Sequence, residues 1–315
     1  KVFGVVFVLV DDLQRGVRWV AGLFTDNTSE NLPGKSITRS EFLGKASLIA
    51  TAIPFGTMAY GIISGAHDYR VRRVKVTLPN LPKAFDGIRV GHISDIHSGS
   101  FYNRTAVKGG VEMMMKEKAH VIFFTGDLVN NQALEMKDYV DVFDKLKAPL
   151  GVYSVTGNHD YGDYHNWSSQ DVKRRNFQDL MEAHKQMNYR LLMNEHEFIR
   201  QGSDSIAVIG NENWGGRGFA KYGKLDKAWK GTDEGAVKLL LSHDPSHWDA
   251  QVRPQFPDID IMFSGHTHGF QFGVEIGDFK WSPSQYAYKQ WSGLYKEGEQ
   301  YLYVNRGFGY LGYPG

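Results

Sequence analysis

Five short apolar segments of this chain each run into a cluster of side chains of the kind that bind metal ions. The segments read HISDIHSGS, FFTGDLVNN, SVTGNHDYGD, LLLSHDPSHW and MFSGHTHGFQ. Short apolar runs bounded by Gly, Asn, Asp and Ser are typical of buried strands. Because ligands bind beyond the carboxyl ends of strands in α/β sheets, we expect the five clusters to meet at one place.

The clusters supply seven candidate metal ligands, which are Asp95, His97, Asp127, Asn158, His243, His266 and His268. The D-x-H and H-x-H pairs each hold two ligands two residues apart. On extended backbone such residues point the same way, so each pair is expected to aim into one site. Two other ligands follow glycines, which allow a sharp turn and a close backbone approach.

Seven ligands are too many for one zinc-like ion and suit two ions that share a carboxylate. Two divalent ions bring four positive charges, and Asp95 and Asp127 return two negative ones. The remaining positive charge suits an anionic phosphoester, and the neutral amide of Asn158 avoids cancelling more of it. Paired ions ~3.5–4 Å apart lower the pKa of bound water and hold the attacking and leaving oxygens.

From Val74 onward, strand-like and helix-like segments alternate, and strand-like segments follow one another later in the chain. This order predicts a mixed α/β fold with helices on the outer faces of the sheets.

The ordered motifs D-x-H, GD, GNHD, H and GHTH resemble those of the calcineurin-like metallophosphoesterases, from roughly residue 88 to the end of the chain. The stretches SDIHSG, SGHTHG and YVNRGFG are similar to bacterial membrane-associated or exported phosphodiesterases within that family. The resemblance implies a four-layer αββα sandwich of two mixed sheets, with a dinuclear metal site at the carboxyl ends of the strands.

The resemblance also implies a role for each ligand. The first ion would be held by Asp95, His97, Asp127 and His268. The second ion would be held by Asp127, Asn158, His243 and His266. His159 would face the substrate and stabilise the charge on phosphorus, and Asp160 would orient His159. These ligand types admit manganese, iron, zinc or nickel. Asn213 and Arg306 are further candidates for contact with the substrate phosphate.

Composition excludes several other functions. The formal net charge is +1, from 36 basic and 35 acidic residues. A dedicated nucleic-acid binder would carry a strong basic excess, so no nucleic-acid partner is expected. The chain has no cysteine, which excludes disulfides, thiolate zinc sites and cysteine nucleophiles.

Residues 1–73 are predicted to form an apolar, membrane-associated region that is truncated at its start, and residues 74–315 the catalytic domain. The run Ala46–Ala66 carries no formal charge over 21 residues, close to the ~20 that span a bilayer. A buried hairpin or a core helix is the alternative. The stretch TRSEFLGK before it resembles a degenerate twin-arginine export signal with one arginine, which favours an extracytoplasmic catalytic domain.

The leading hypothesis is therefore a two-metal phosphoester hydrolase, either a phosphodiesterase or a pyrophosphatase, acting on a membrane-proximal or lipid-linked substrate. A metal-bridging hydroxide would attack phosphorus. One alternative is a broad phosphatase or phosphodiesterase on soluble substrates. Another is a membrane-associated interaction protein with a structural metal site, which would have no use for His159 and Asp160. The aromatic-rich stretch from Phe279 could form a substrate wall, lie against a membrane or simply pack.

Overall fold

The computed structural model describes residues 2–22, 38–277 and 279–312. The chain divides into two compact units, residues 1–65 and residues 66–315, and each is described by itself. The predicted domain boundary, between residues 73 and 74, stays a prediction.

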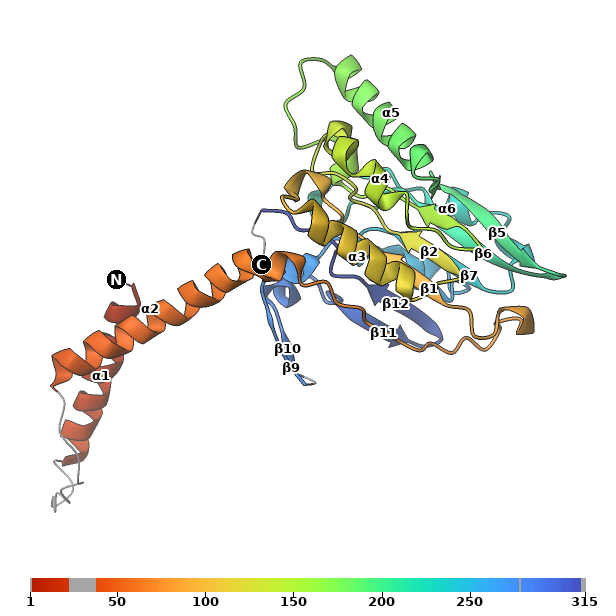
Figure 1. Cartoon of the computed structure of the whole chain (residues 1–315). Coiled ribbons are helices and arrows are strands. Elements are labelled where there is room, and N and C mark those ends of the chain that lie inside the picture. Colours follow the sequence, from red (N-terminus) through yellow and green to blue (C-terminus); the bar gives the residue numbers. More distant parts are fainter. Residues whose placement is uncertain (1, 23–37, 278, 313–315) are drawn as a thin grey trace. The chain divides into compact units, whose positions relative to one another are not determined.

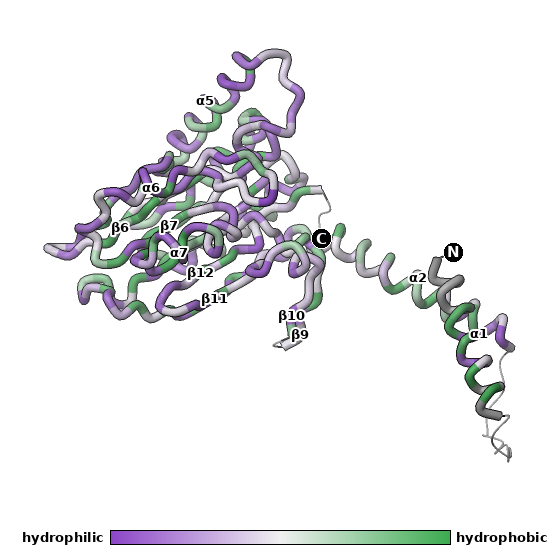
Figure 2. The backbone as a smooth tube through the Cα atoms, turned by 180° about the vertical axis from the view of Figure 1, so that it is seen from behind, coloured by the Kyte–Doolittle hydropathy of each residue, from purple (hydrophilic) through white to green (hydrophobic). Residues whose placement is uncertain are grey.

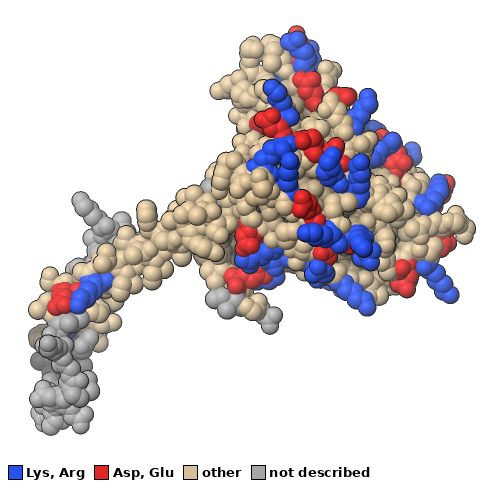
Figure 3. All heavy atoms as spheres, in the orientation of Figure 1, with Lys and Arg blue, Asp and Glu red and all other residues tan. Residues whose placement is uncertain are grey.

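The first unit contains two helices, α1 (Val2–Gly22) and α2 (Arg39–Ile63), which contact each other (Figure 1). Thr38 caps α2 by accepting a hydrogen bond from the Glu41 amide at 3.2 Å. The predicted charge-free run is helical through Pro54 up to Ile63, and a short 3-10 turn at Gly65–His67 follows it; no residue of α2 is buried. Because α2 is a single helix, the run up to Ile63 does not fold back on itself as a hairpin. With the residues up to His67, this helix is long and apolar enough to cross a membrane, and most of it is uncharged in Figure 3.

The smaller sheet of the second unit has four parallel strands in the order β1-β2-β3-β4. They are β1 (Val90–Ile93), β2 (Val121–Phe124), β3 (Val152–Ser154) and β4 (Arg190–Leu191). The connections carry the helices α3 (Arg104–Lys116), α4 (Val140–Phe143) and α5 (Gln170–Gln186). The described strands of this sheet pair only in parallel, where a mixed sheet was expected, because a helical segment lies between each strand and the next.

The larger sheet has six strands in the order β11-β12-β8-β7-β6-β5 and is mixed. Its strands are β5 (Glu195–Gln201), β6 (Asp204–Asn211), β7 (Lys238–Ser242), β8 (Ile261–Ser264), β11 (Gly293–Glu297) and β12 (Gln300–Val304). Strands β6, β7, β8 and β12 run parallel, and the edge strands are antiparallel to their neighbours. The helices α6 (Leu225–Trp229) and α7 (Arg253–Gln255) belong to this half.

Alternate strand residues face different layers, which gives the four-layer order. Val121 and Phe123 of β2 pack with Leu239 and Leu241 of β7 between the sheets. Ile122 and Phe124 pack on the other side, in a cluster with residues of α3 and α5. Likewise, Leu240 faces a third cluster that includes Trp248. Figure 2 shows the apolar residues concentrated along central strands such as β6 and β7. The predicted αββα sandwich is confirmed.

The segment after β12 connects the two sheets. The amides of Phe308 and Gly309 donate to the carbonyls of Ser94 and Asp95, each at 2.8 Å. Asn305 Nδ2 donates to the His92 carbonyl at 3.0 Å. The end of the described chain is thereby fastened to the loop that follows β1.

Candidate metal centre

The seven predicted ligands all lie just beyond a strand of one sheet or the other. Asp95 and His97 follow β1, Asp127 follows β2, and Asn158 follows β3. The remaining three follow β7 and β8 of the larger sheet, and they are His243, His266 and His268. The carboxyl ends of five strands thus meet at one place, as the sequence predicts.

The prediction that the paired ligands lie on extended backbone is wrong. Neither pair is extended. Asp95 and His97 have φ of 51° and 47°, and His266 and His268 have φ of 71° and 49°. Asp127 is also left-handed, with φ of 58°. Left-handed backbone is uncommon for residues other than glycine and clusters at functional sites. These five ligands point inward because the chain turns sharply after β1, β2 and β8.

Asp95, His97 and His268 form one group, with ligand atoms within 4.8 Å of one another. His97 Nε2 lies 3.0 Å from His268 Nε2. His268 Nε2 lies 3.3 Å from Asp95 Oδ1. Two imidazole nitrogens and a carboxylate oxygen therefore converge on one point.

Asp127, His243 and His266 form the second group. Asp127 Oδ2 lies 3.1 Å from His243 Nε2 and 3.6 Å from His97 Nε2, so this one oxygen lies near both groups. His266 Nδ1 lies 3.2 Å from His243 Nε2. Asn158 Oδ1 is buried and has no hydrogen-bond partner among the described residues.

The outer nitrogens of these histidines show that the site fits metal ions. His97 Nδ1 faces the Asn130 Oδ1 acceptor at 3.1 Å, and His243 Nδ1 faces the Thr125 carbonyl at 2.8 Å. An oxygen acceptor on the outer nitrogen keeps the proton there and turns a bare nitrogen inward. In each group these inward-facing nitrogens lie close to one another. Their lone pairs repel, so the arrangement is unfavourable unless a cation lies between them.

The buried charges agree with that fit. Burial would raise the pKa of Asp95 and of Asp127, but neighbouring imidazoles hold both below their ordinary values. Burial lowers the pKa of His97 to about 3 and that of His266 to about 4. Burial opposes protonation of His243, yet the Asp127 carboxylate raises its pKa to about 10. Ionised carboxylates and neutral imidazoles are the metal-binding states, so an ion would displace the His243 proton.

Tyrosines that the sequence reasoning missed hold two of the ligands. Tyr288 Oη lies 2.8 Å from His266 Nε2, which leaves Nδ1 of His266 to point into the site. Asn158 Nδ2 donates to Tyr164 Oη at 3.0 Å, which turns the amide oxygen of Asn158 the other way. No sequence motif marks either tyrosine as a neighbour of these ligands.

His159 lies at the partly exposed side of the site. Its ring is 4.9 Å from that of His97, and its Nδ1 lies 2.7 Å from the Asn130 carbonyl. Asp160 was expected to orient His159, but its carboxylate has other partners. The Asp160 carboxylate is buried and accepts hydrogen bonds from the amides of Asp127, Leu128 and Gly157 at 2.8–2.9 Å. Asn130 therefore orients His159, because the carboxylate of Asp160 is already engaged by the backbone.

The side chains of the two predicted substrate-binding residues, Asn213 and Arg306, each have a partner within the protein. Asn213 is buried, and its Nδ2 donates to the Ala220 carbonyl of its own loop at 2.9 Å. Arg306 lies beside Gly269, the residue after His268, and its guanidinium is 3.1 Å from Glu275 Oε2. Their contact with substrate stays a prediction.

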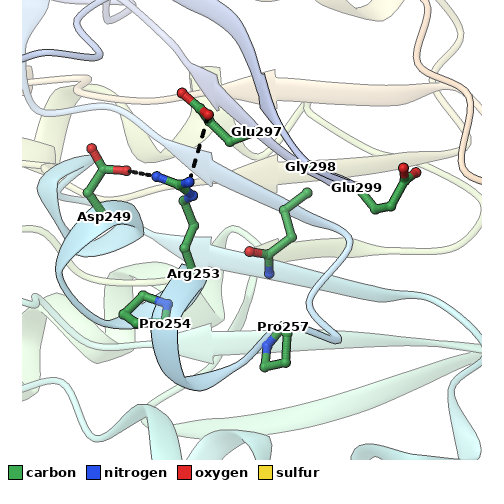
Figure 4. A pocket seen from close by; sticks show the side chains of 8 residues that line it. Asp249, Arg253, Pro254, Pro257, Glu297, Gly298 and Glu299 are labelled. Atoms are coloured by element: carbon green, nitrogen blue, oxygen red, sulfur yellow. Dashed lines mark hydrogen bonds and ion pairs between the residues drawn. The ribbon is translucent and has the colours of Figure 1, made fainter.

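A pocket elsewhere on the second unit is distinct from the metal centre. Arg253 lies between Asp249, at 2.7 Å, and Glu297, at 3.7 Å (Figure 4). Pro254, Pro257 and residues 298–300 complete the lining. None of the seven predicted ligands lines this pocket. The Arg253 guanidinium within it is already paired with Asp249 and Glu297.

Residues 88–270 match the sequence model of the family described as Calcineurin-like phosphoesterase. This match covers more than half of the chain, and the chain belongs to that family of metal-dependent phosphoester hydrolases. Residues 1–66 match a second model, described as Probable Calcineurin-like phosphoesterase, transmembrane domain. That match supports association of the chain with a membrane.

Curated relatives agree with both matches. A transmembrane protein with metallophosphoesterase domain from Danio rerio is 29% identical over 303 residues, covering 90% of this chain and 64% of that protein. The metallophosphoesterase YkuE of Bacillus subtilis is 25% identical over 291 residues, covering 89% of this chain and 93% of that protein. The chain thus spans less than two thirds of the Danio rerio relative.

Solved structures are more distant. NAD nucleotidase of Haemophilus influenzae has a TM-score of 0.46 and 16% identity, over 71% of this chain and 45% of that one.

Proposed function

We propose that the chain hydrolyses a phosphodiester or pyrophosphate bond in a membrane-proximal or lipid-linked substrate. The observation that carries the proposal is the meeting of two largely buried three-ligand groups around Asp127, with His159 at their partly exposed side. Membership of the phosphoesterase family supports the reaction. The match of residues 1–66 to a transmembrane domain supports the choice of a substrate at a membrane.

The first ion would be bound by Asp95, His97, Asp127 and His268, and the second by Asp127, Asn158, His243 and His266. Two divalent ions supply an activated water nucleophile and offset the negative charge of the phosphoryl oxygens. The protein holds the ligands ready for that task. The Asp160 carboxylate holds the backbone amides of Asp127 and Gly157. The Tyr164 hydroxyl accepts from the Asn158 amide group and so directs its oxygen into the site.

His159 is the residue that we assign to the substrate. Its Nδ1 is committed to the Asn130 carbonyl, so its Nε2 is the nitrogen that can meet a phosphoryl or leaving oxygen. When protonated, Nε2 would donate a hydrogen bond to the charge that develops and a proton to the leaving group. A purely structural metal site needs no such residue, which counts against the interaction-protein alternative.

The test is a substrate screen of the full chain, reconstituted in lipid and loaded separately with manganese, iron, zinc or nickel. The substrates are phospholipids, nucleotide-linked lipids, a soluble bis-aryl phosphodiester and an aryl phosphomonoester. We expect turnover of a lipid-linked diester or pyrophosphate to exceed that of both soluble compounds. Turnover of soluble compounds alone would reject the lipid-linked substrate. No turnover with any metal would reject catalysis.

The catalytic unit is proposed to lie outside the cytoplasm, because of the export-signal-like stretch before the apolar run. The chain has no cysteine, so one introduced cysteine reports the side of the membrane. In intact cells, Lys185→Cys should react with a membrane-impermeant maleimide. Labelling only after the cells are broken would place the unit in the cytoplasm.

A further inference from the structure

A short hairpin leaves the metal centre directly after His268. The turn His268–Gln271 leads into β9 (Val274–Ile276), which pairs with β10 (Phe279–Trp281). This hairpin projects from the body of the second unit in Figure 1. A two-stranded ribbon of this length gains little stability on its own.

The two faces of the hairpin differ completely in chemistry. In the antiparallel register, Trp281 lies opposite Val274, and Lys280 lies opposite Glu275. Because side chains alternate along a strand, Val274, Phe279 and Trp281 share one face. Phe272 joins that face, with its ring 6.2 Å from the ring of Trp281. We call this set the apolar face of the hairpin.

The opposite face is charged and is fastened to the rest of the unit. Glu275 lies 2.8 Å from Arg72 Nη2 and 3.1 Å from Arg306 Nη2, and Lys280 Nζ is 3.6 Å away. Three cations therefore meet one carboxylate among the described residues. These ion pairs set which face of the hairpin turns toward the unit and which turns away.

The apolar face is exposed. Phe279 keeps 61% of its surface accessible, Phe272 47% and Val274 43%. Phe270 and Tyr286, at 47% and 79%, are further exposed aromatic residues in the turns on either side of the hairpin. A contiguous exposed apolar patch marks a surface that binds a partner or a membrane.

We propose that the apolar face of the hairpin docks on a lipid bilayer. Aromatic residues are enriched where proteins meet the membrane–water interface, and this face holds Phe and Trp. The same chain contains a helix long and apolar enough to cross a membrane, and its first 66 residues match a transmembrane family domain. A lipid bilayer is therefore the partner we choose for this face.

Docking there would bring the metal centre to the lipid surface. The hairpin is continuous with His268, and Arg306 links the hairpin to the residue after that ligand. A phosphoester near the headgroup level would then reach the site without leaving the membrane. This consequence for the substrate rests on the proposed function, whereas the docking itself does not.

The experiment uses the absence of cysteine from the chain. In the full chain, Phe279→Cys carries an environment-sensitive fluorophore, and the protein is reconstituted in phosphatidylcholine–phosphatidylglycerol vesicles with plain or brominated acyl chains. Bromine quenches a fluorophore only when the two are close. We expect blue-shifted emission and quenching at position 279. The control, Lys185→Cys on α5, replaces a side chain that is 80% exposed and should show neither.

Every other outcome overturns the proposal. A label at 279 that stays in water, like the label at 185, means that the hairpin does not dock. Blue-shifted emission without quenching by bromine means that protein covers the face, either a second copy or another part of the chain.

A second variant guards against a local effect of the label. Adding Phe272→Ser should weaken docking about tenfold, because one aromatic side chain leaves the apolar contact. Hydrolysis of a soluble diester should not change in that variant. Unaltered quenching would contradict docking through this face. Quenching at 279 without turnover of any lipid would leave the docking intact and reject the lipid-linked substrate.

Discussion

The carboxylate of Asp160 accepts a hydrogen bond from the backbone amide of Asp127 at 2.9 Å. The same carboxylate oxygen accepts another from the Gly157 amide at 2.8 Å. One buried side chain therefore joins the loop after β2 to the loop after β3, and each loop carries a candidate ligand. Asp160 shapes the site through the backbone rather than through the imidazole of His159.

Asp160→Asn should destabilise the protein. The side-chain NH₂ of asparagine would face backbone N–H groups, which cannot accept a hydrogen bond. Each buried polar group left unsatisfied lowers the free energy of unfolding by about 1–3 kcal/mol. We expect thermal unfolding at a lower temperature and a reduced metal content, measured in detergent on the full chain. A variant with normal stability and metal content but low activity would instead favour a direct effect on His159.

His159→Ala should keep both ions and lose activity. The ring is partly exposed, and we assign it no ligand role, so elemental analysis should match the unaltered protein. Loss of a general acid lowers kcat by about 10²–10⁴-fold. His165→Ala, a partly exposed histidine of the same region, is the control and should stay active. Unchanged turnover of a bis-aryl phosphodiester by His159→Ala would remove His159 from the mechanism.

Asp127→Ala should lose both ions, because Asp127 Oδ2 lies near the ligand atoms of both groups. Asp95→Ala should mainly affect the group that contains His97 and His268. Metal-to-protein ratios measured after dialysis check this contrast. One ion retained at full occupancy in Asp127→Ala would show that the carboxylate is not shared.

Tyr288→Phe should weaken the second ion. The hydroxyl holds His266 Nε2 at 2.8 Å, and losing a partner of this kind lowers metal affinity or activity about 10–100-fold. Tyr286→Phe is a close control, since Tyr286 is 79% exposed. Competition with a chelator should separate the two variants. Equal metal affinities would mean that the tyrosine hydroxyl does not orient His266.

Gly157→Ala should displace the Asp127 carboxylate by a steric clash and so disturb the group formed by Asp127, His243 and His266. A Cβ at this position would lie 2.2 Å from Asp127 Oδ1, so the carboxylate must move. We expect a folded protein with reduced metal binding. Gly109→Ala in α3 is the control, because nothing lies within 4 Å of its added Cβ and alanine favours a helix. Normal metal content in Gly157→Ala would mean that the loop shifts without cost.

The meeting of the candidate ligands could be predicted because it depends on local pattern, whereas the four-layer order came from the resemblance to the calcineurin-like family. Apolar runs ending in D-x-H or GHTH are visible in one stretch of chain. The left-handed backbone at Asp95 and His266 could not be predicted, because nothing in those motifs distinguishes it from extended chain. The partners of Asp160, His97 and His266 come from distant loops, and their hydrogen bonds exist only once both sheets are in place.

The fastening of Phe308 and Gly309 to the loop after β1 has a consequence for how the protein matures. One candidate ligand, Asp95, is held by a segment made more than two hundred residues later in the chain. The loop that carries Asp95 is therefore completed only when β12 and the residues after it are in place. We therefore expect metal to bind only after β12 has joined the larger sheet and the segment behind it has closed on the loop after β1.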